Sequence, residues 1–239
     1  MRHFGIIGKP LVQSFSARYF NEKFGREEID AEYSLYPLER IEDARPLLER
    51  LDGMNVTMPF KQSIIPLLDG MDNTAREVGA VNVVCKKIGY NTDCLGFMHS
   101  IRQALCADDK RALVLGTGGA SKAIQYGLRQ LGIDYTIVSR TPGAGMLGYD
   151  DLTEEIMRTH QVIVNCTPLG MYPDVDSCAP ISYEWISRNH LLYDCVYNPE
   201  ITLFLKEGKA RGARTMNGIG MLYGQAEEAW KIWTGIGDK

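Results

Sequence analysis

The chain has 239 residues, 45% hydrophobic and 23% charged, a composition that fits one large or two modest globular domains and excludes wholesale disorder. Its formal net charge of −4 provides no excess of positive charge for bulk binding to nucleic acid or to an anionic membrane. The six cysteines have neither Cys-x-x-Cys nor zinc-ribbon spacing, and no apolar run approaches the roughly 18 residues of a membrane span. We therefore expect a cytoplasmic protein that does not depend on nucleic acid, a membrane or a metal ion.

Short apolar runs alternate with helical patterns through the first hundred residues. The pattern predicts strands over 4–7, 33–38, 55–57 and 80–85, a hairpin return at 90–92, and helices over 17–24, 41–51, 61–68 and 95–105. Such alternation is the signature of an α/β architecture.

A charged stretch over 107–111 interrupts this pattern and is a candidate domain boundary. A second α/β series follows it. We expect strands over 112–115, 135–138, 162–166, 191–195 and 214–216, and helices over 121–131, 152–159, 183–187, 202–211 and 221–233. The sequence therefore predicts an α/β fold built from two α/β domains.

A glycine-rich turn joins the first strand of the second series to its helix. Gly116 permits the tight turn, and Gly118 lets the backbone approach a pyrophosphate, to which the helix N-terminus offers free N–H groups. Ser121 stands where the usual fingerprint has its third glycine. The strand and helix on either side favour dinucleotide binding over a plain glycine-rich turn.

The end of the next strand indicates which dinucleotide is bound. An NAD site usually places an acidic residue there, about 20 residues on, to hold the ribose 2′-hydroxyl. This chain instead has Ser139, Arg140 and Thr141. A guanidinium beside two hydroxyls suits a 2′-phosphate, which predicts NADP; the alternative is a solvated arginine in a loop.

Polar residues mark a second candidate site in the first half of the chain. Asn55 and Thr57 alternate on a strand end and share a face, and Lys61 follows Pro59 at the start of a short helix. This arrangement of polar side chains is suited to binding a hydroxylated substrate, although a lone lysine is more often a solvated surface charge. Asp93 precedes an apolar helix and is compatible with both a functional role and an N-cap. Asn82 could equally satisfy backbone groups.

Several motifs occur in one order on either side of the glycine turn. They are Ser14-Phe15-Ser16, Asn55 to Lys61, Gly79 to Asn82, Asn91-Thr92-Asp93, Asn165 to Met171, Asp194 to Pro199, and Asn217 to Gln225. In this order the chain resembles the shikimate 5-dehydrogenase family over nearly its whole length. The resemblance implies a substrate-binding domain over 1–101 plus 219–239, to which the last helix returns, and an NADP-binding Rossmann-like domain over 102–218, with a cleft between them.

The resemblance also implies a reaction and a set of site residues. The reaction is the reversible NADPH-dependent reduction of 3-dehydroshikimate to shikimate, with Lys61 and Asp93 as the catalytic pair. The substrate-binding residues are Ser14, Ser16, Asn55, Thr57, Asn82, Tyr197 and Gln225. The cofactor-binding residues are Gly116, Gly118, Gly119, Ala120, Ser121, Ser139, Arg140, Thr141, Thr167, Met171, Gly218 and Met221.

Other interpretations of these residues remain open. Ser16 can serve as an N-cap, Tyr197 can be packing, and Met221 can belong to the core of the last helix. A related enzyme acting on quinate with NAD, or a noncatalytic dinucleotide-binding regulatory module, would share most of these motifs. We expect a monomer or a homodimer with a small-molecule substrate.

Overall fold

The computed structural model describes residues 1–11 and 14–236, which form two compact α/β units. The first unit comprises Met1–Thr92 and the chain from Ala226 onward, and the second comprises Asp93–Gln225. Within the described part of the chain, no helix has the length and hydropathy needed to cross a membrane. The α/β architecture with two units agrees with the prediction.

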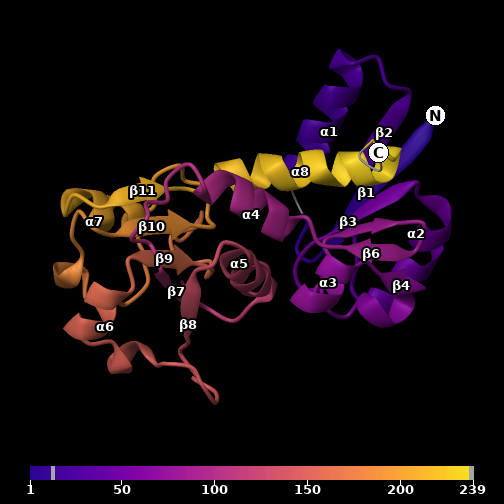
Figure 1. Ribbon diagram of the computed structural model, residues 1–239. Coiled ribbons are helices and arrows are strands. Elements are labelled where there is room, and N and C mark those ends of the chain that lie inside the picture. Colours follow the sequence, from indigo (N-terminus) through magenta and orange to yellow (C-terminus); the bar gives the residue numbers. More distant parts are fainter. Residues whose placement is uncertain (12–13, 237–239) are drawn as a thin grey trace. The chain divides into compact units, whose positions relative to one another are not determined.

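The first unit contains a mixed six-stranded sheet (Figure 1). Its strand order is β2 (Ala31–Pro37), β1 (Arg2–Gly8), β3 (Gly53–Val56), β5 (Val83–Cys85), β6 (Ile88–Tyr90) and β4 (Gly70–Met71). Strand β1 is parallel to both neighbours, whereas β5 is antiparallel to β3 and β6. The helical elements are α1 (Phe15–Arg26), the 3₁₀ turn η1 (Ile41–Ala44), α2 (Arg45–Arg50), the 3₁₀ turn η2 (Ile65–Leu67) and α3 (Asn73–Val78).

An aromatic cluster forms one side of this unit's core. Phe4 of β1 packs against Trp230 and Trp233, whose ring centroids lie 5.6 and 5.0 Å away, and Phe20 of α1 stacks on Tyr33 of β2 at 5.0 Å. The two tryptophans come from the end of α8 (Ile219–Thr234), so the last helix completes the core of the first unit. This agrees with the expectation that the last helix returns to the N-terminal domain.

Two helical predictions in the first unit need correction. The expected helix over 61–68 is a series of turns ending in η2, because Pro66 lacks a backbone N–H and its ring would clash with the preceding turn of an α-helix. Helix α3 was not expected. The Asp72 carboxylate caps its start by accepting bonds from the Ala75 and Thr74 N–H groups, and Gly79 ends it in the left-handed conformation at φ 67°.

The second unit contains a parallel five-stranded sheet. Its order is β11 (Arg214–Met216), β10 (Leu191–Asp194), β9 (Val162–Asn165), β7 (Arg111–Leu115) and β8 (Asp134–Val138). Its helices are α4 (Asp93–Ile101), α5 (Gly119–Gln130), α6 (Glu154–Thr159) and α7 (Leu203–Ala210), with 3₁₀ turns η3 (Tyr149–Asp151) and η4 (Tyr183–Trp185). Thus 183–187, expected as an α-helix, is a single 3₁₀ turn. The order of connections reverses between β7 and β9, where doubly wound sheets bind their ligands.

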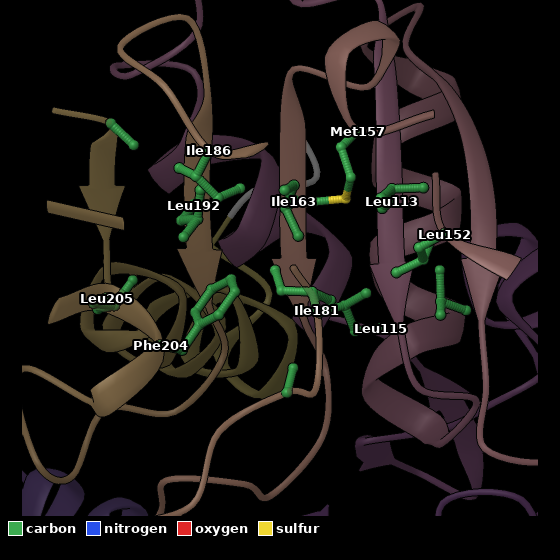
Figure 2. Close-up of a cluster of buried hydrophobic side chains, with 13 residues drawn as sticks. Leu113, Leu115, Leu152, Met157, Ile163, Ile181, Ile186, Leu192, Phe204 and Leu205 are labelled. Carbon is green, nitrogen blue, oxygen red and sulfur yellow. The ribbon is translucent and has the colours of Figure 1, made fainter. Parts of the chain in front are cut away.

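Both faces of the parallel sheet are covered. Leu113, Ile163 and Leu192 point to one face, where Met157 and Phe204 pack on them (Figure 2). Their neighbours in sequence point to the opposite face and pack with residues of α4 and α5, because successive side chains of a strand alternate. Burial on both faces explains why these strands appear as continuous apolar runs in the sequence.

The boundaries of the units differ from the predicted domain boundaries. The stretch 107–111 lies inside the second unit, where Asp109 is 4% exposed and its two carboxylate oxygens accept bonds of 2.9 Å from the Arg214 guanidinium. Helix α4 packs with α5 in the second unit, although the predicted substrate-binding domain, 1–101, includes it. The charged stretch that resembles a linker in the sequence therefore contains a residue, Asp109, that forms an internal ion pair with Arg214. The assignment of a function to each domain stays a prediction.

Candidate functional site

Thr57 and Lys61 follow the carboxyl end of β3 in the first unit, and Thr57 lies beside the end of β1. The Thr57 N–H donates to the Ile7 carbonyl at 3.0 Å, after which the chain turns through Pro59. Lys61 is half-buried, and its carbonyl accepts a 2.7 Å bond from the Val81 N–H. The backbone of Lys61 is thereby fixed beside the segment that leads to Asn82, which is more order than a solvated surface lysine requires.

Asn55 and Asn82 are buried and joined to each other. The Asn55 side chain donates to the Asn82 carbonyl at 3.2 Å. The Asn82 amide in turn accepts a 2.8 Å bond from the Thr92 N–H and donates to the Thr92 hydroxyl at 3.0 Å. Both asparagines therefore satisfy backbone groups, as one interpretation of the sequence anticipated for Asn82. The substrate contacts that the resemblance implies would therefore be made by side chains whose positions are already fixed by hydrogen bonds within the protein.

The two serines of the first motif lie at the start of α1. Ser14 occupies the N-cap position, and its side chain makes no capping hydrogen bond. Ser16 is inside the first turn and buried, so the interpretation of Ser16 as the N-cap is wrong. Ser16 instead lies close enough to the Tyr33 hydroxyl to influence the pKa of that group.

Tyr33 is a residue that the sequence motifs did not indicate. Its side chain is 3% exposed, and its hydroxyl donates a 2.6 Å bond to Asn55 Oδ1. Burial raises the pKa of Tyr33 well above its ordinary value, while the nearby Ser16 hydroxyl acts in the opposite direction. A tyrosine on the buried face of a strand has a hydroxyl that needs a hydrogen-bond partner. This was the feature of the sequence that could have indicated Tyr33.

Asp93 is the first residue of α4 and is 6% exposed. It thus lies in the first turn of the helix, one position beyond an N-cap, where the helix dipole favours a carboxylate. Thr92, which directly precedes it, is fully buried and held by the Asn82 side chain. The position of the Asp93 backbone is therefore set by the same asparagine that the resemblance places in the substrate site.

The glycine turn of the second unit has the geometry of a phosphate-binding turn. Gly116 adopts φ 104°, a conformation that L-residues with side chains rarely adopt, and its N–H donates to the Val138 carbonyl at 2.8 Å. Gly118 is the N-cap of α5, and a Cβ atom added there would meet no protein atom within 4 Å. Protein packing therefore does not require a glycine at 118, whereas a ligand lying close to the backbone would. Gly119 and Ala120 begin α5 directly behind it.

Ser121, in place of the third glycine, contacts the turn from inside the unit. It is fully buried, and its hydroxyl donates to the Gly116 carbonyl at 2.7 Å. It also accepts a 3.0 Å bond from Gln125. The serine therefore shapes the turn instead of presenting its hydroxyl at the surface.

Arg140 lies two residues beyond the end of β8, at the edge where the Gly116 N–H bonds Val138. Its side chain is exposed. Burial raises the pKa of Tyr149, and the nearby positive charge of Arg140 partly opposes that shift. The Ser139 hydroxyl accepts a bond from the Thr141 N–H at 3.2 Å and so orders the loop that carries the arginine. An exposed guanidinium beside a helix N-terminus fits a dinucleotide with an additional phosphate.

A buried polar network supports Thr167 at the end of β9. The Thr167 hydroxyl donates to Asn165 Oδ1 at 2.6 Å, and Asn165 donates to Asp194 Oδ1 at 2.9 Å. Asp194 Oδ2 accepts a 2.5 Å bond from the Thr202 hydroxyl. Burial raises the pKa of Asp194 to about 6, although these donors oppose the shift. Asn165, Asp194 and Thr202 received no role from the sequence, where the signal was a polar residue at the end of each buried strand.

The remaining predicted residues of the second unit lie in different environments. Met171 and Tyr197 are each 40% exposed, whereas Met221 is 8% exposed and packs in the core, as the alternative interpretation anticipated. Gly218 is buried so closely that a Cβ atom would lie 2.3 Å from the Cys195 carbonyl oxygen. Gln225 is 8% exposed and donates to the Leu222 carbonyl at 2.9 Å.

Residues 1–11 and 14–236 contain no cluster of three or more His, Cys, Asp or Glu side chains that could hold a metal ion. The residues described above offer a lysine, a carboxylate and a set of hydroxyl and amide groups, together with the glycine turn before α5.

Comparisons with known proteins agree with this arrangement. Residues 6–84 match a family model described as the shikimate dehydrogenase substrate binding domain. The shikimate dehydrogenase (NADP(+)) of Methanococcus aeolicus is 35% identical, with 97% of this chain and 91% of that protein covered. The crystal structure of shikimate dehydrogenase from Aquifex aeolicus is similar with a TM-score of 0.87 at 34% identity, covering 98% of this chain and 93% of that one.

A second similar structure contains ligands. It is shikimate 5-dehydrogenase from Thermus thermophilus in complex with NADP(H) and shikimate. The TM-score is 0.87 at 28% identity, with 98% of this chain and 94% of that chain covered. The similarity therefore extends over both α/β units.

Proposed function

The chain belongs to the shikimate dehydrogenase family, and from this membership we infer that it is an NADP-dependent oxidoreductase that reversibly reduces 3-dehydroshikimate to shikimate. The observation that carries this inference is the 35% identity to a shikimate dehydrogenase (NADP(+)) over 97% of the chain. The six cysteines, all free thiols, fit the reducing cytoplasm in which we place the enzyme.

Lys61 is the residue that we assign to the proton. When bound, NADPH supplies the hydride for the carbonyl carbon of the substrate. As negative charge grows on the carbonyl oxygen, the Lys61 ammonium stabilises it and donates a proton to that oxygen. In the direction of shikimate oxidation, the same amine accepts the hydroxyl proton. Asp93 is the second member of the pair and hydrogen-bonds the same hydroxyl, from the helix N-terminus where its carboxylate is favoured.

The substrate carboxylate is assigned to Ser14 and Ser16. The Ser14 hydroxyl makes no capping hydrogen bond with the backbone N–H groups at the start of α1. Thr57, Asn82, Gln225 and Tyr197 are assigned to the ring hydroxyls. Asn55 acts with them, and its bonds to Tyr33 and to the Asn82 carbonyl support a role in holding the other groups in place.

The residues of the second unit fit NADP. The N–H groups at the start of α5, from Gly118, Gly119 and Ala120, would hold the diphosphate, with Gly116 and Ser121 maintaining the turn. Arg140 and Thr141 would hold the 2′-phosphate, and Ser139 would order their loop. The nicotinamide would be bordered by Thr167 and Met171. Gly218 and Met221 would contribute by fixing the position of the backbone next to it.

Loss of NADPH absorbance in the presence of 3-dehydroshikimate tests this function. We expect turnover at catalytic enzyme concentrations, with shikimate identified as the product by mass and chromatographic retention. NADPH oxidation that does not depend on the keto acid, or no oxidation by a folded enzyme, would contradict the proposal. A faster reaction with quinate and NAD⁺ would instead identify the related quinate activity.

A further inference from the structure

Tyr33 reaches across a strand to contact residues of the proposed substrate site. In the sheet order β2-β1-β3, Tyr33 is paired with Phe4, which is in turn paired with Gly53. These three residues, and Asn55 two positions beyond Gly53, share one face of the sheet. The Tyr33 ring stacks on Phe20 with centroids 5.0 Å apart, and its hydroxyl is thereby directed to Asn55.

Through its hydroxyl, Tyr33 begins a continuous series of buried hydrogen bonds. Tyr33 donates to Asn55 Oδ1, Asn55 donates to the Asn82 carbonyl, and the Asn82 side chain holds Thr92. Ser16 of α1 lies near the Tyr33 hydroxyl. Each of these five side chains is less than 10% exposed. The hydroxyl of Tyr33 thus joins β2 to β3 and, through Asn55 and Asn82, to the residue before Asp93.

The direction of the protons in this series is determined by the acceptors. Because Asn55 Nδ2 is the donor to the Asn82 carbonyl, Oδ1 faces Tyr33 and must accept the Tyr33 proton. A substrate carboxylate is a stronger acceptor than a neutral phenol oxygen, so the Ser16 hydroxyl can donate to it while Tyr33 keeps its bond to Asn55.

We propose that Tyr33 is a positioning residue of the substrate site, which holds the Asn55–Asn82 pair in the geometry that binds the ring hydroxyls. The inference rests on the proposed function. Tyr33 itself is buried and acts through its partners. Since those partners hold parts of the substrate that do not react, their misplacement weakens the ground state and the transition state alike, which raises KM and changes kcat little.

The test is the isosteric substitution Tyr33→Phe, with Tyr193→Phe as the matched control. Tyr193 is fully buried in the second unit, and its hydroxyl lies 2.7 Å from that of Ser100, so the control loses the same atom from a similar environment. We expect Tyr33→Phe to raise KM for shikimate about tenfold, with KM for NADP and kcat within about threefold of wild type. Tyr193→Phe should leave KM for shikimate unchanged at a comparable loss of thermal stability.

A second measurement separates positioning from general destabilisation. Because Tyr33 acts through Asn55, the KM effects of Tyr33→Phe and Asn55→Ala should be less than multiplicative in the double variant. An unchanged KM for shikimate in a folded Tyr33→Phe enzyme would overturn the inference, as would equal increases in both KM values or equal effects of the two tyrosine variants. An inactive wild-type enzyme would contradict the proposed function itself and the inference that rests on it.

Discussion

At the scale of single residues, Lys61 carries the chemistry of the proposed reaction. Its charge matters most when the substrate oxygen develops negative charge, so Lys61→Met should lower kcat about 10²- to 10⁴-fold and affect shikimate binding much less. Steady-state kinetics and equilibrium binding of shikimate measure the two effects separately. A kcat within about threefold of wild type would remove Lys61 from the mechanism.

Asp93 has two interpretations that one substitution can separate. Asp93→Asn keeps the size of the side chain but removes the charge. If Asp93 is catalytic, kcat should fall by a similar order to the loss in Lys61→Met, with a small change in melting temperature. If the carboxylate only stabilises the N-terminus of α4, the melting temperature should fall while kcat is retained. Thermal unfolding and kinetics of the same preparation decide between these outcomes.

Arg140 is the residue that we expect to select NADP. Removing the guanidinium in Arg140→Ala should raise KM for NADP about tenfold and leave KM for NAD nearly unchanged, because only NADP carries the 2′-phosphate. Since the side chain is exposed, the effect should decrease with rising salt concentration. Equal losses for both cofactors would indicate a structural role for Arg140 near Tyr149.

At the scale of elements, the start of α5 makes a prediction about a single methyl group. Gly118 has φ −71°, and the space that a Cβ would enter contains no protein atom within 4 Å. Gly118→Ala should therefore leave thermal stability nearly unchanged but raise KM for NADP about tenfold, because the methyl group would occupy the space of the diphosphate. Gly25→Ala adds a methyl group to equally open space in α1; it should leave KM for NADP unchanged and not lower thermal stability, because alanine favours the helix. An unaffected KM in Gly118→Ala would place the diphosphate elsewhere.

Asp194 makes the network at the ends of β9 and β10 sensitive to pH. Burial raises the pKa of Asp194 from 3.8 to about 6, so the folded protein binds a proton more tightly than the unfolded chain does. This contribution to stability is fully present below about pH 4 and is lost as pH rises through 6. Relative to Asp194→Asn, the free energy of unfolding of wild type should therefore increase by about 2 kcal/mol between pH 7 and pH 4. Denaturant unfolding at both pH values measures this; a difference independent of pH would show that Asp194 titrates normally.

The sequence predicted those helices and strands whose signals lie within a short stretch of neighbouring residues. The strands of the parallel sheet are buried on both faces and form apolar runs, and the turn at Gly116 lies between a clear strand and a clear helix. Helix α3 was missed although Asp72 and Gly79 are standard capping residues, because its six residues contain too few apolar positions to show a period. The helix expected over 61–68 was wrong because Pro66 outweighed the apolar spacing.

The candidate site was predicted in part. The order of the motifs indicated Lys61, Asp93 and the glycine turn, because each lies within a short stretch of sequence that is recognisable by itself. The contact of Tyr33 with Asn55 was not predictable, because it depends on β1 lying between β2 and β3, a consequence of the tertiary fold. The same holds for Asp109, whose pairing with Arg214 joins residues 105 positions apart.

At the scale of the whole molecule, the chain leaves the first unit after Thr92, forms the second unit, and returns at Ala226. The proposed site residues are divided between the units. Ser14, Ser16, Asn55 and Lys61 belong to the first unit, and the second contains Asp93, Tyr197, Gln225 and the glycine turn. Each unit has its own buried core, so substitutions at the dinucleotide turn should not alter the hydrogen bonds around Tyr33.

The central claim is that the enzyme is an NADP-dependent shikimate dehydrogenase. It is tested most directly by kcat/KM for the four combinations of shikimate or quinate with NADP⁺ or NAD⁺. We predict the highest value for shikimate with NADP⁺ and a loss of about tenfold or more when either partner is exchanged. A higher value for quinate, or for NAD⁺ over NADP⁺ with shikimate, would contradict the account.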